Sequence, residues 1–482
     1  MVSAGKKSTC LMTCGSLLIV TGAIMVVFWP AIFYSQLKKM MILTDTSTSF
    51  SIWKDIPIPL YLECYLYHIT NVEEILSGKD HKIKVEQRGP YVFREFHTKE
   101  NITWNDNSTV TFYNKKVWHF RPDMSNGTLA DNVTNINPII ATVAYFMRYQ
   151  HPILKLTVDV FMKTIHEHMF ITATASDWLF DGIDDPILRI AERFPELPFT
   201  IPFDKFGWFY DVTVGARMWW HSPRTVFRGE CGEVRGSTGE SIYVFAPDLC
   251  TYMTLFKNVS TTVLGIEGVT YAANDSLFDN GYKYPRKACY CAEVRDRDCL
   301  PSGALNVSHC RYGAPAMVSQ PHFLNMDPYY AQKVEGMDPK HDMNMVLTLE
   351  MFTGMPLGVS AQLQINMLIR YVEAISLNNQ LPEDDILVPM MWFRQELSTT
   401  QEYADMARMA LNVRYGVPYG LYALTVSICR LIVSMLLITK QCLLSNFHLS
   451  VIKIEVSDDQ TQFILSLILF TDYTQFSLPN HT

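Results

Sequence analysis

The segment CYCAEVRDRDC contains residues that can do chemistry. Its thiols belong to Cys289, Cys291 and Cys299, and Cys310 follows eleven residues later. Thiols at such spacing either bind a metal ion or form disulfide bonds, and the compartment decides between the two. Zinc sites favour pairs of cysteines separated by two residues, whereas Cys289 and Cys291 are separated by one, and no second C-x-C or histidine pair completes a four-ligand set here. If this segment lies outside the cytoplasm, we expect disulfide bonds and no metal.

Two apolar stretches near the ends of the chain can anchor it in a membrane. Residues 11–33 carry no charge, and a helix of this length crosses the roughly 30 Å hydrocarbon layer. The stretch is longer than the apolar region of a cleaved signal peptide, which is about 7–15 residues, so we interpret it as a transmembrane helix. Residues 417–439 predict a second transmembrane helix. Arg430 lies within it, and a buried or interfacial helix is the competing interpretation.

Seven Asn-x-Ser/Thr triplets lie between the two apolar stretches. Lysines flank the first stretch on both sides, so the distribution of positive charge does not fix its orientation. Seven triplets without a middle proline indicate a glycosylated domain in the lumen or outside the cell. The asparagines are Asn101, Asn107, Asn126, Asn132, Asn258, Asn274 and Asn306.

An oxidising compartment favours disulfide bonds among the cysteines of this outer domain. Six of its seven cysteines lie between residues 231 and 310, and six cysteines allow fifteen pairings. Cys289 and Cys291 are poor partners for each other, because a single intervening residue strains the bond. Cys64 lies in the alternating, strand-like run LYLECYLYHI, where a buried free thiol is expected.

Five short motifs occur in a characteristic order along the chain. They are EQRGPYVFRE at 86–95, LFDGIDDP at 179–186, PHFLNMDP at 321–328, TGMPLGVSAQLQIN at 353–366 and PMMW at 389–392. Together with the cysteine cluster, they resemble the class B scavenger receptors, also called the fatty acid translocase family. That family includes insect-type scavenger receptors, lysosomal integral membrane proteins and sensory neuron membrane proteins. The resemblance extends from the first apolar stretch to about residue 420.

The resemblance implies the fold of an α+β membrane protein. Its large ectodomain would be an irregular antiparallel β-barrel with a helical cap and an internal hydrophobic tunnel, tethered by N- and C-terminal transmembrane helices. The implied disulfide bonds are Cys231–Cys289, Cys250–Cys310 and Cys291–Cys299. The predicted domains are a cytoplasmic tail at 1–10, a transmembrane helix at 11–33, an ectodomain at 34–416 with its cap at 138–169, a second transmembrane helix at 417–439 and an atypical cytoplasmic tail at 440–482.

The resemblance also implies a function. We expect a plasma-membrane receptor with two spans that binds lipids or lipoprotein particles and passes lipid through the tunnel to the membrane. Its ligands would be fatty acids, sterols, carotenoids, oxidised lipids or apoptotic cells. The alternatives are a lysosomal or endosomal receptor with a pH-dependent protein cargo, and a sensory co-receptor for lipid pheromones.

Composition and motifs narrow the class of protein further. A formal net charge of −8 argues against a nucleic-acid partner, which needs a basic face. The sequence has no glycine-rich phosphate loop and no G-x-S-x-G elbow, so we predict neither an enzyme nor a cofactor. The runs STVTFYNKKVWHF at 108–120 and SIYVFAP at 241–247 predict strands of a binding domain. Three cysteines near the predicted membrane boundaries are either S-palmitoylated or chance apolar residues. These are Cys10, Cys14 and Cys442.

Two helices are predicted for the cap. Asn137 can cap a helix that starts at Pro138, and a second apolar pattern follows His151 and Pro152. In the second pattern one apolar stripe is expected to pack on neighbouring elements, and the polar side chains are expected to lie away from it. The stripe is Leu154, Val158, Phe161, Ile165 and Met169, and the polar residues are Lys155, Asp159 and His166.

Six cap residues are candidate lipid contacts. Phe146, Met147 and Phe161 are predicted to border a lipid entrance, where a flexible methionine tolerates varied acyl chains. Lys163, His166 and His168 can offer positive charge to a carboxylate or an oxidised-lipid phosphate, and the histidines would make that attraction pH-dependent. The competing interpretations are ordinary core packing for the apolar side chains and a solvated helix end for the basic ones.

Overall fold

A computed structural model describes most of the chain between residues 4 and 445. The residues outside the description are 1–3, 108, 194–202, 211–223, 228–238, 247–248, 250, 292–298, 352, 382–384 and 446–482. The chain divides into two compact units. The large unit is Ala31–Arg414, and the helical unit is Met1–Pro30 with Tyr415–Thr482.

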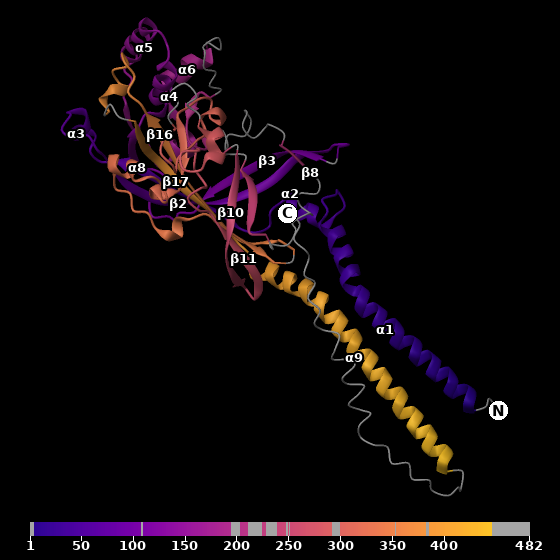
Figure 1. Cartoon of the computed structure of the whole chain (residues 1–482). Coiled ribbons are helices and arrows are strands. Elements are labelled where there is room, and N and C mark those ends of the chain that lie inside the picture. The colour runs from indigo at the N-terminus through magenta and orange to yellow at the C-terminus, as the bar shows by residue number, and fades with distance from the viewer. Residues whose placement is uncertain are drawn as a thin grey trace. The chain divides into compact units, whose positions relative to one another are not determined.

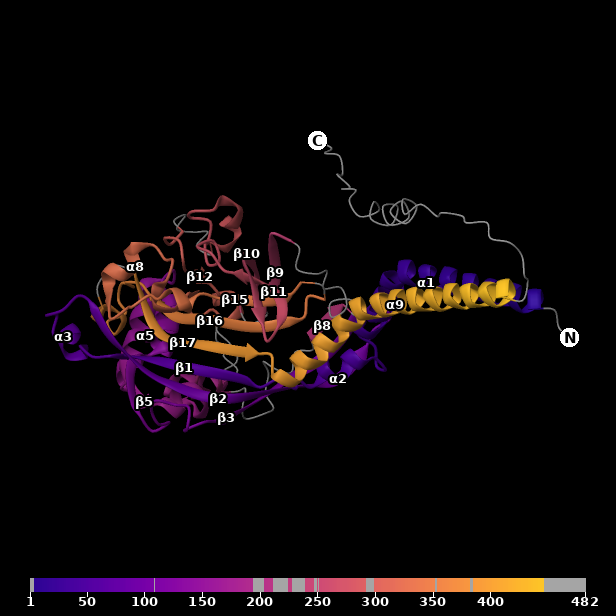
Figure 2. The same cartoon turned by 90° about the horizontal axis from the view of Figure 1, so that it is seen from below.

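One extensive sheet forms the body of the large unit. The strands follow the path β8-β3-β2-β1-β17-β16-β15-β11-β10-β9, and neighbours on this path pair antiparallel. Its strands are β1 (Leu60–Ile69), β2 (Ile83–Trp104), β3 (Thr109–Phe120), β8 (Arg224–Phe227), β9 (Ser241–Ala246), β10 (Thr251–Val263), β11 (Ile266–Ala272), β12 (Leu305–Asn306), β13 (Ala316–Ser319), β14 (Val334–Glu335), β15 (Val346–Glu350), β16 (Pro356–Ile369) and β17 (Ile386–Ser398). Figure 2 shows β1, β2, β16 and β17 running side by side along the unit.

The pairing of β1 with β17 explains how both ends of the large unit connect to terminal helices. Leu60, the first residue of β1, pairs with Leu397 near the end of β17. The chain therefore enters β1 and leaves β17 at the same end of the sheet. Helix α9 (Gln401–Ser445) begins three residues after β17, and α2 (Thr48–Lys54) precedes β1. The large antiparallel sheet agrees with the predicted fold class, whereas barrel closure and a tunnel stay predictions.

The helices of the predicted cap lie together at one end of the large unit. They are α4 (Pro138–Met147), α5 (Pro152–Thr164) and α6 (Pro186–Arg193). Figure 1 shows them at the end opposite the β10–β11 hairpin and the first turns of α9. The smaller elements are α3 (Val72–Leu76), α8 (Pro328–Lys333), the π-helical turn η1 (Asp177–Asp181), the paired strands β4 (Asn132–Ile136) and β5 (Phe170–Thr174), and the paired strands β6 (Ile183–Asp184) and β7 (Lys205–Phe206).

A buried polar network runs through the core between the strands. The side-chain oxygen of Gln364 accepts hydrogen bonds from the Tyr67 hydroxyl at 2.8 Å and from the His322 backbone N–H at 2.7 Å. The Asp338 N–H donates to Nδ1 of His322, so the ring proton is on Nε2, which donates to Gln87 Oε1 at 2.7 Å. Burial lowers the pKa of His322 to about 4. The histidine is therefore a neutral structural residue near physiological pH.

Two long helices contain parts that are apolar enough to cross a membrane. Helix α1 (Ala4–Met41) and helix α9 each contain a candidate span by length and composition, Val20–Met40 and Gly416–Met435. These windows overlap the predicted spans at 11–33 and 417–439. Gly22 of α1 is buried, and a Cβ at this position would overlap the side chain of Thr425 in α9. Small residues allow such close approach between transmembrane helices.

Candidate functional site

The outer face of α5 is the main apolar feature of the cap. Its five side chains are between 40% and 71% exposed, although each is aliphatic or aromatic. We define this α5 outer face as Ile153, Leu154, Leu156, Val160 and Phe161. The surface of a soluble domain rarely has so many exposed apolar side chains on consecutive helical turns unless that surface contacts a partner, a ligand or a membrane.

The predicted orientation of α5 was wrong in part: Val158, Ile165 and Met169 of the predicted stripe pack against the main core, but the rest of the pattern differs. Leu154 and Phe161 of the predicted core stripe are exposed, whereas Asp159, which was expected to face away, is only 3% exposed. Asp159 Oδ1 accepts hydrogen bonds from the Ser376 N–H at 2.7 Å and the Ser376 hydroxyl at 2.8 Å. The buried side of the helix is centred on Met162 instead, with Val158 and Ile165 partly buried beside it.

The local sequence pattern could not reveal which side of α5 is buried, because the helix carries apolar residues on nearly every side. What decides its orientation is the distant loop at Ser376, which offers hydrogen-bond donors to a carboxylate. Burial would raise the pKa of Asp159, but the hydrogen bonds from Lys163 and Ser376 outweigh it and the pKa is lowered. The ionised carboxylate thus holds α5 by its polar side and leaves the apolar outer face in solvent.

The structure separates the six candidate lipid contacts. Phe161 lies on the α5 outer face, whereas Met147 is buried and Phe146 is partly buried in the main core. Lys163 Nζ lies 2.8 Å from Asp159 Oδ2, so its charge is engaged within the helix. His166 and His168 are exposed just beyond the end of α5. The sequence reasoning missed Ile153, Leu156 and Val160, whose signal was the excess of apolar residues over what one buried stripe requires.

Two buried carboxyl groups join the helices of the cap. Asn137 caps α4, Asp185 accepts from the N–H groups of Ile187 and Leu188 at the start of α6, and Glu167 lies just after α5. Asn137 donates to Glu167 Oε2 at 3.2 Å, and Glu167 Oε1 has no hydrogen-bond partner. Burial raises the pKa of Glu167 to about 7, and the charge of Asp185 adds to this effect. A titratable junction therefore lies where the start of α4, the end of α5 and the start of α6 meet.

The cysteines of the outer domain are described in part. Cys291 and Cys299 form a disulfide bond, with their Cα atoms 5.3 Å apart, and Cys310 is disulfide-bonded as well. Cys231 and Cys250 lie outside the described residues, as does the side chain of Cys289. Cys64 is buried and free, as its strand pattern predicts, and burial raises its pKa well above the usual value. The side chains at the predicted palmitoylation positions, Cys10, Cys14 and Cys442, also lie outside the description.

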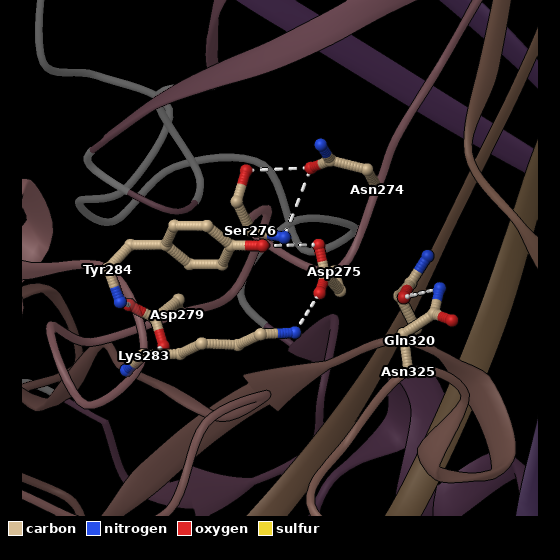
Figure 3. A network of polar contacts seen from close by, with 8 residues as sticks. All are labelled: Asn274, Asp275, Ser276, Asp279, Lys283, Tyr284, Gln320 and Asn325. Atoms are coloured by element: carbon tan, nitrogen blue, oxygen red, sulfur yellow. Dashed lines mark hydrogen bonds and ion pairs between the residues drawn. The ribbon is translucent and has the colours of Figure 1, made fainter.

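The asparagines of the seven triplets lie where a glycan could be attached. Six of them are exposed and Asn306 is of intermediate exposure. Figure 3 shows Asn274, whose Oδ1 accepts from the Ser276 N–H at 3.0 Å and the Ser276 hydroxyl at 2.6 Å. Asp275 between them points instead to Tyr284, which donates a hydrogen bond at 2.8 Å, and to Lys283. The middle side chain of this triplet is thus held against the loop that leads to the cysteine cluster.

Comparison with known proteins agrees with these features. A model of the CD36 family matches residues 13–230 and 215–439. The chain is 32% identical over 420 residues to scavenger receptor class B member 1 of Cricetulus griseus, covering 79% of each chain. It is 29% identical over 429 residues to protein peste of Drosophila melanogaster, covering 80% of this chain and 75% of the relative. It is 26% identical over 463 residues to lysosome membrane protein 2 of Homo sapiens, covering 86% and 93%.

Proposed function

The chain belongs to the CD36 family, and from this premise we propose that it is a cell-surface scavenger receptor that takes up lipid. It binds lipids or lipoprotein particles at the cap and passes lipid through the ectodomain to the membrane, without catalysing a reaction. The two apolar helices fit a topology with two membrane spans. In this proposal the ectodomain is a barrel enclosing an apolar tunnel, and the segments 1–10 and 440–482 are cytoplasmic.

The observation that carries this proposal is the α5 outer face. Covering these five exposed apolar side chains with a lipid or an apolar ligand favours binding, because each Å² of apolar surface removed from water lowers the free energy by about 25 cal/mol. Lys155 lies on the same helix, so the apolar face has a cationic residue near it. A lipid surface with anionic groups offers partners for both kinds of side chain. Asp159 keeps this face outward by holding the opposite side of the helix.

Replacing Leu156 or Val160 with glutamate should weaken binding of lipoprotein particles about tenfold. The reason is that burying either apolar side chain against a particle contributes at least about 1.5 kcal/mol to the binding free energy. The measurement is particle binding and uptake of labelled lipid by cells that express the full chain, compared with cells that lack it. The matched control is Leu76→Glu, since Leu76 on α3 is 52% exposed, close to the 56% of Leu156. Surface expression of every variant is measured in parallel.

Two results would count against the receptor proposal. If cells with and without the chain take up the same amount of labelled lipid, the chain does not transport that lipid. If Leu156→Glu and Leu76→Glu behave alike, the α5 outer face is not the contact surface, even if uptake depends on the chain.

Glycosidase treatment should increase the electrophoretic mobility of the chain made in cells that glycosylate normally. This follows because the seven triplets lie between the two candidate spans, and their asparagines are exposed or of intermediate exposure. Asn71 and Asn280 provide the contrast, because both are buried and neither starts a triplet. Unchanged mobility would mean that this domain does not face the lumen or the outside of the cell. The disulfide pairing and the ligand proposal would lose their basis with it.

A lysosomal or endosomal receptor is the second candidate. Glu167 favours it, because a carboxyl group with a pKa raised to about 7 changes charge between neutral and acidic compartments. The similarity to lysosome membrane protein 2 points to the same compartment. If the chain is found at the lysosomal membrane and binds a protein more tightly at neutral than at acidic pH, this candidate replaces the cell-surface receptor.

A further inference from the structure

The turn of the β10–β11 hairpin contains a leucine where the backbone disfavours one. Val263 pairs with Ile266, so the turn consists of Leu264 and Gly265. Their φ angles are 48° and 78°, and hairpin turns with positive φ at both residues favour Asn-Gly or Gly-Gly, because larger side chains crowd the backbone there. The Leu264 side chain is also 40% exposed. Neither the backbone conformation nor core packing explains a leucine at this position.

The strand register places two further segments at the end of the sheet where this turn lies. Glu350, the last residue of β15, pairs with Gly268, three residues after the turn. The last residue of β17 pairs with Gly358 near the start of β16. The loop that contains Met351 and the start of α9 therefore lie at the same end of the sheet as the turn. Figure 1 shows the β10–β11 hairpin beside the first turns of α9.

The first turns of α9 pack on this end of the sheet by one side of the helix. Ala404 is fully buried, and Ala407 and Leu411 pack against the same apolar cluster, which includes the first residue of β11. A Cβ at Gly265 would lie 3.2 Å from Nη1 of Arg408. The hairpin turn therefore lies against α9 at the level of Arg408.

The opposite side of these helical turns carries exposed apolar side chains. Met406, Met409 and Val413 are three and four residues apart, so they share one side of α9, about 200° from the buried set two residues earlier. The preceding residue on this side is the exposed Glu402, where the apolar stripe ends. In the other direction, the candidate span begins at Gly416, three residues after Val413. The exposed apolar stripe thus extends along α9 towards the candidate span.

The exposed apolar side chains of the hairpin turn, the loop after β15 and the start of α9 form one group, which we call the anchor-side rim. They are between 40% and 67% exposed, and they are Leu264, Met351, Met406, Met409 and Val413. A group of this kind usually marks a contact surface. At a rise of about 1.5 Å per residue, Val413 lies about 5 Å and Met409 about 10 Å before the candidate span. The head-group layer of a bilayer is about 5–8 Å thick on each side, so the lower part of the rim reaches it.

We propose that the anchor-side rim enters the lipid interface of the membrane that holds the chain, with Leu264 at the tip of a membrane-contacting hairpin. The continuity of the rim with the candidate span along α9 favours a bilayer over a second copy of the chain as the partner. Burial of the Leu264 side chain in lipid would also offset its unfavourable backbone conformation. This inference rests on the two-span topology of the proposed function and adds to it a contact between the ectodomain and the bilayer.

The test places a photoreactive diazirine amino acid at one position at a time in the full chain, reconstituted in phosphatidylcholine vesicles. The probes at Leu264 and Met409 should give at least about tenfold more lipid adduct than a probe at Val259, because an apolar side chain prefers lipid to water by about this factor. Val259 is the matched control, since it is 54% exposed on the same hairpin, five residues before the tip. Mass spectrometry distinguishes adducts with lipid from adducts between two chains.

The variant Leu264→Asn gives a second measurement in which misfolding is not expected. Asparagine suits the positive φ of this turn position, so the thermal unfolding midpoint in detergent should not fall. A probe at Met351, on the neighbouring loop, should lose lipid adduct in this variant, because the tip no longer favours contact with lipid. An unchanged yield at Met351 would contradict the proposed role of Leu264.

Two other results would overturn the inference. Adducts mainly between two chains would show that a second copy covers the rim, and equal lipid adducts from Leu264 and Val259 would show that the hairpin tip has no special contact with the bilayer. Uptake of labelled lipid by cells is measured separately. Uptake that depends on the chain, without lipid adducts at Leu264, would refute the rim and leave the receptor proposal intact. Lipid adducts at Leu264 without such uptake would have the opposite meaning.

Discussion

Replacing Gln364 with leucine should lower the free energy of unfolding by about 2–6 kcal/mol, because two buried groups lose their acceptor at about 1–3 kcal/mol each. The groups are the Tyr67 hydroxyl and the His322 N–H, which donate to the Gln364 oxygen at 2.8 Å and 2.7 Å. Asn366 also loses the hydrogen bond that Gln364 donates at 2.7 Å. Tyr67, Gln364 and Asn366 are fully buried, so water cannot replace these contacts.

The test is the thermal unfolding midpoint of the full chain in detergent, together with the fraction of chain that reaches the cell surface. Gln401→Leu serves as the control, because Gln401 is exposed at the start of α9 and makes one surface hydrogen bond to Asp405. A midpoint for Gln364→Leu that equals that of Gln401→Leu would show that the network does not stabilise the fold.

The same network gives a physical reason for the motifs that revealed the family. His322 lies in PHFLNMDP, Gln364 in TGMPLGVSAQLQIN, Gln87 in EQRGPYVFRE and Trp392 in PMMW. In the structure, His322 and Trp392 both donate to Gln87 Oε1 at 2.7 Å, and the His322 N–H donates to Gln364. Four motifs far apart in the sequence thus meet in one hydrogen-bonded group. The sequence showed their order, but nothing local in it could show that they touch.

Elements with a strong local signal could be predicted. Asn137 followed by Pro138 starts α4, the alternation around Cys64 forms β1, and the run at 109–120 forms β3. A capping side chain and a period of two act within a few residues, so local sequence is sufficient for them. Two apolar helices of membrane-spanning length were recognised for the same reason.

Features that depend on distant partners were not predictable in this way. Asp159 looked like a solvated residue because its partner, Ser376, lies in another part of the chain. Glu95 and Lys99 are spaced like residues of a polar strand edge, and only the pairing with β3 and β17 shows that they are buried. Arg394 donates to Glu63 across the β1–β17 pair at 2.7 Å. In each case a tertiary contact decides what a charged side chain does.

Replacing Glu167 with glutamine should stabilise the protein above pH 7 and have no effect below pH 4.5. In the folded state the pKa of Glu167 is raised from 4.5 to about 7, mainly by burial and further by Asp185. The native state therefore keeps a proton that the unfolded state releases, and stability is lost as the pH rises through this window. At about 1.4 kcal/mol per pKa unit, the loss is at most about 3.5 kcal/mol, and an uncharged glutamine avoids it.

His322 gives the wild-type profile a contribution of opposite sign, so the comparison of variants is what isolates Glu167. The pKa of His322 is lowered from 6.5 to about 4, so the unfolded state takes up a proton first and stability is lost as the pH falls through that range. Because His322 is present in both proteins, its contribution cancels in the difference between Glu167→Gln and wild type.

The thermal unfolding midpoints of Glu167→Gln and wild type, measured from acidic to neutral pH, should therefore differ only towards neutral pH. Glu373→Gln, at an exposed position in the loop near Ser376, should give no pH-dependent difference. If the two variants have parallel profiles, the carboxyl junction of the cap does not titrate between neutral and acidic compartments, and the acid-sensing receptor loses its structural support.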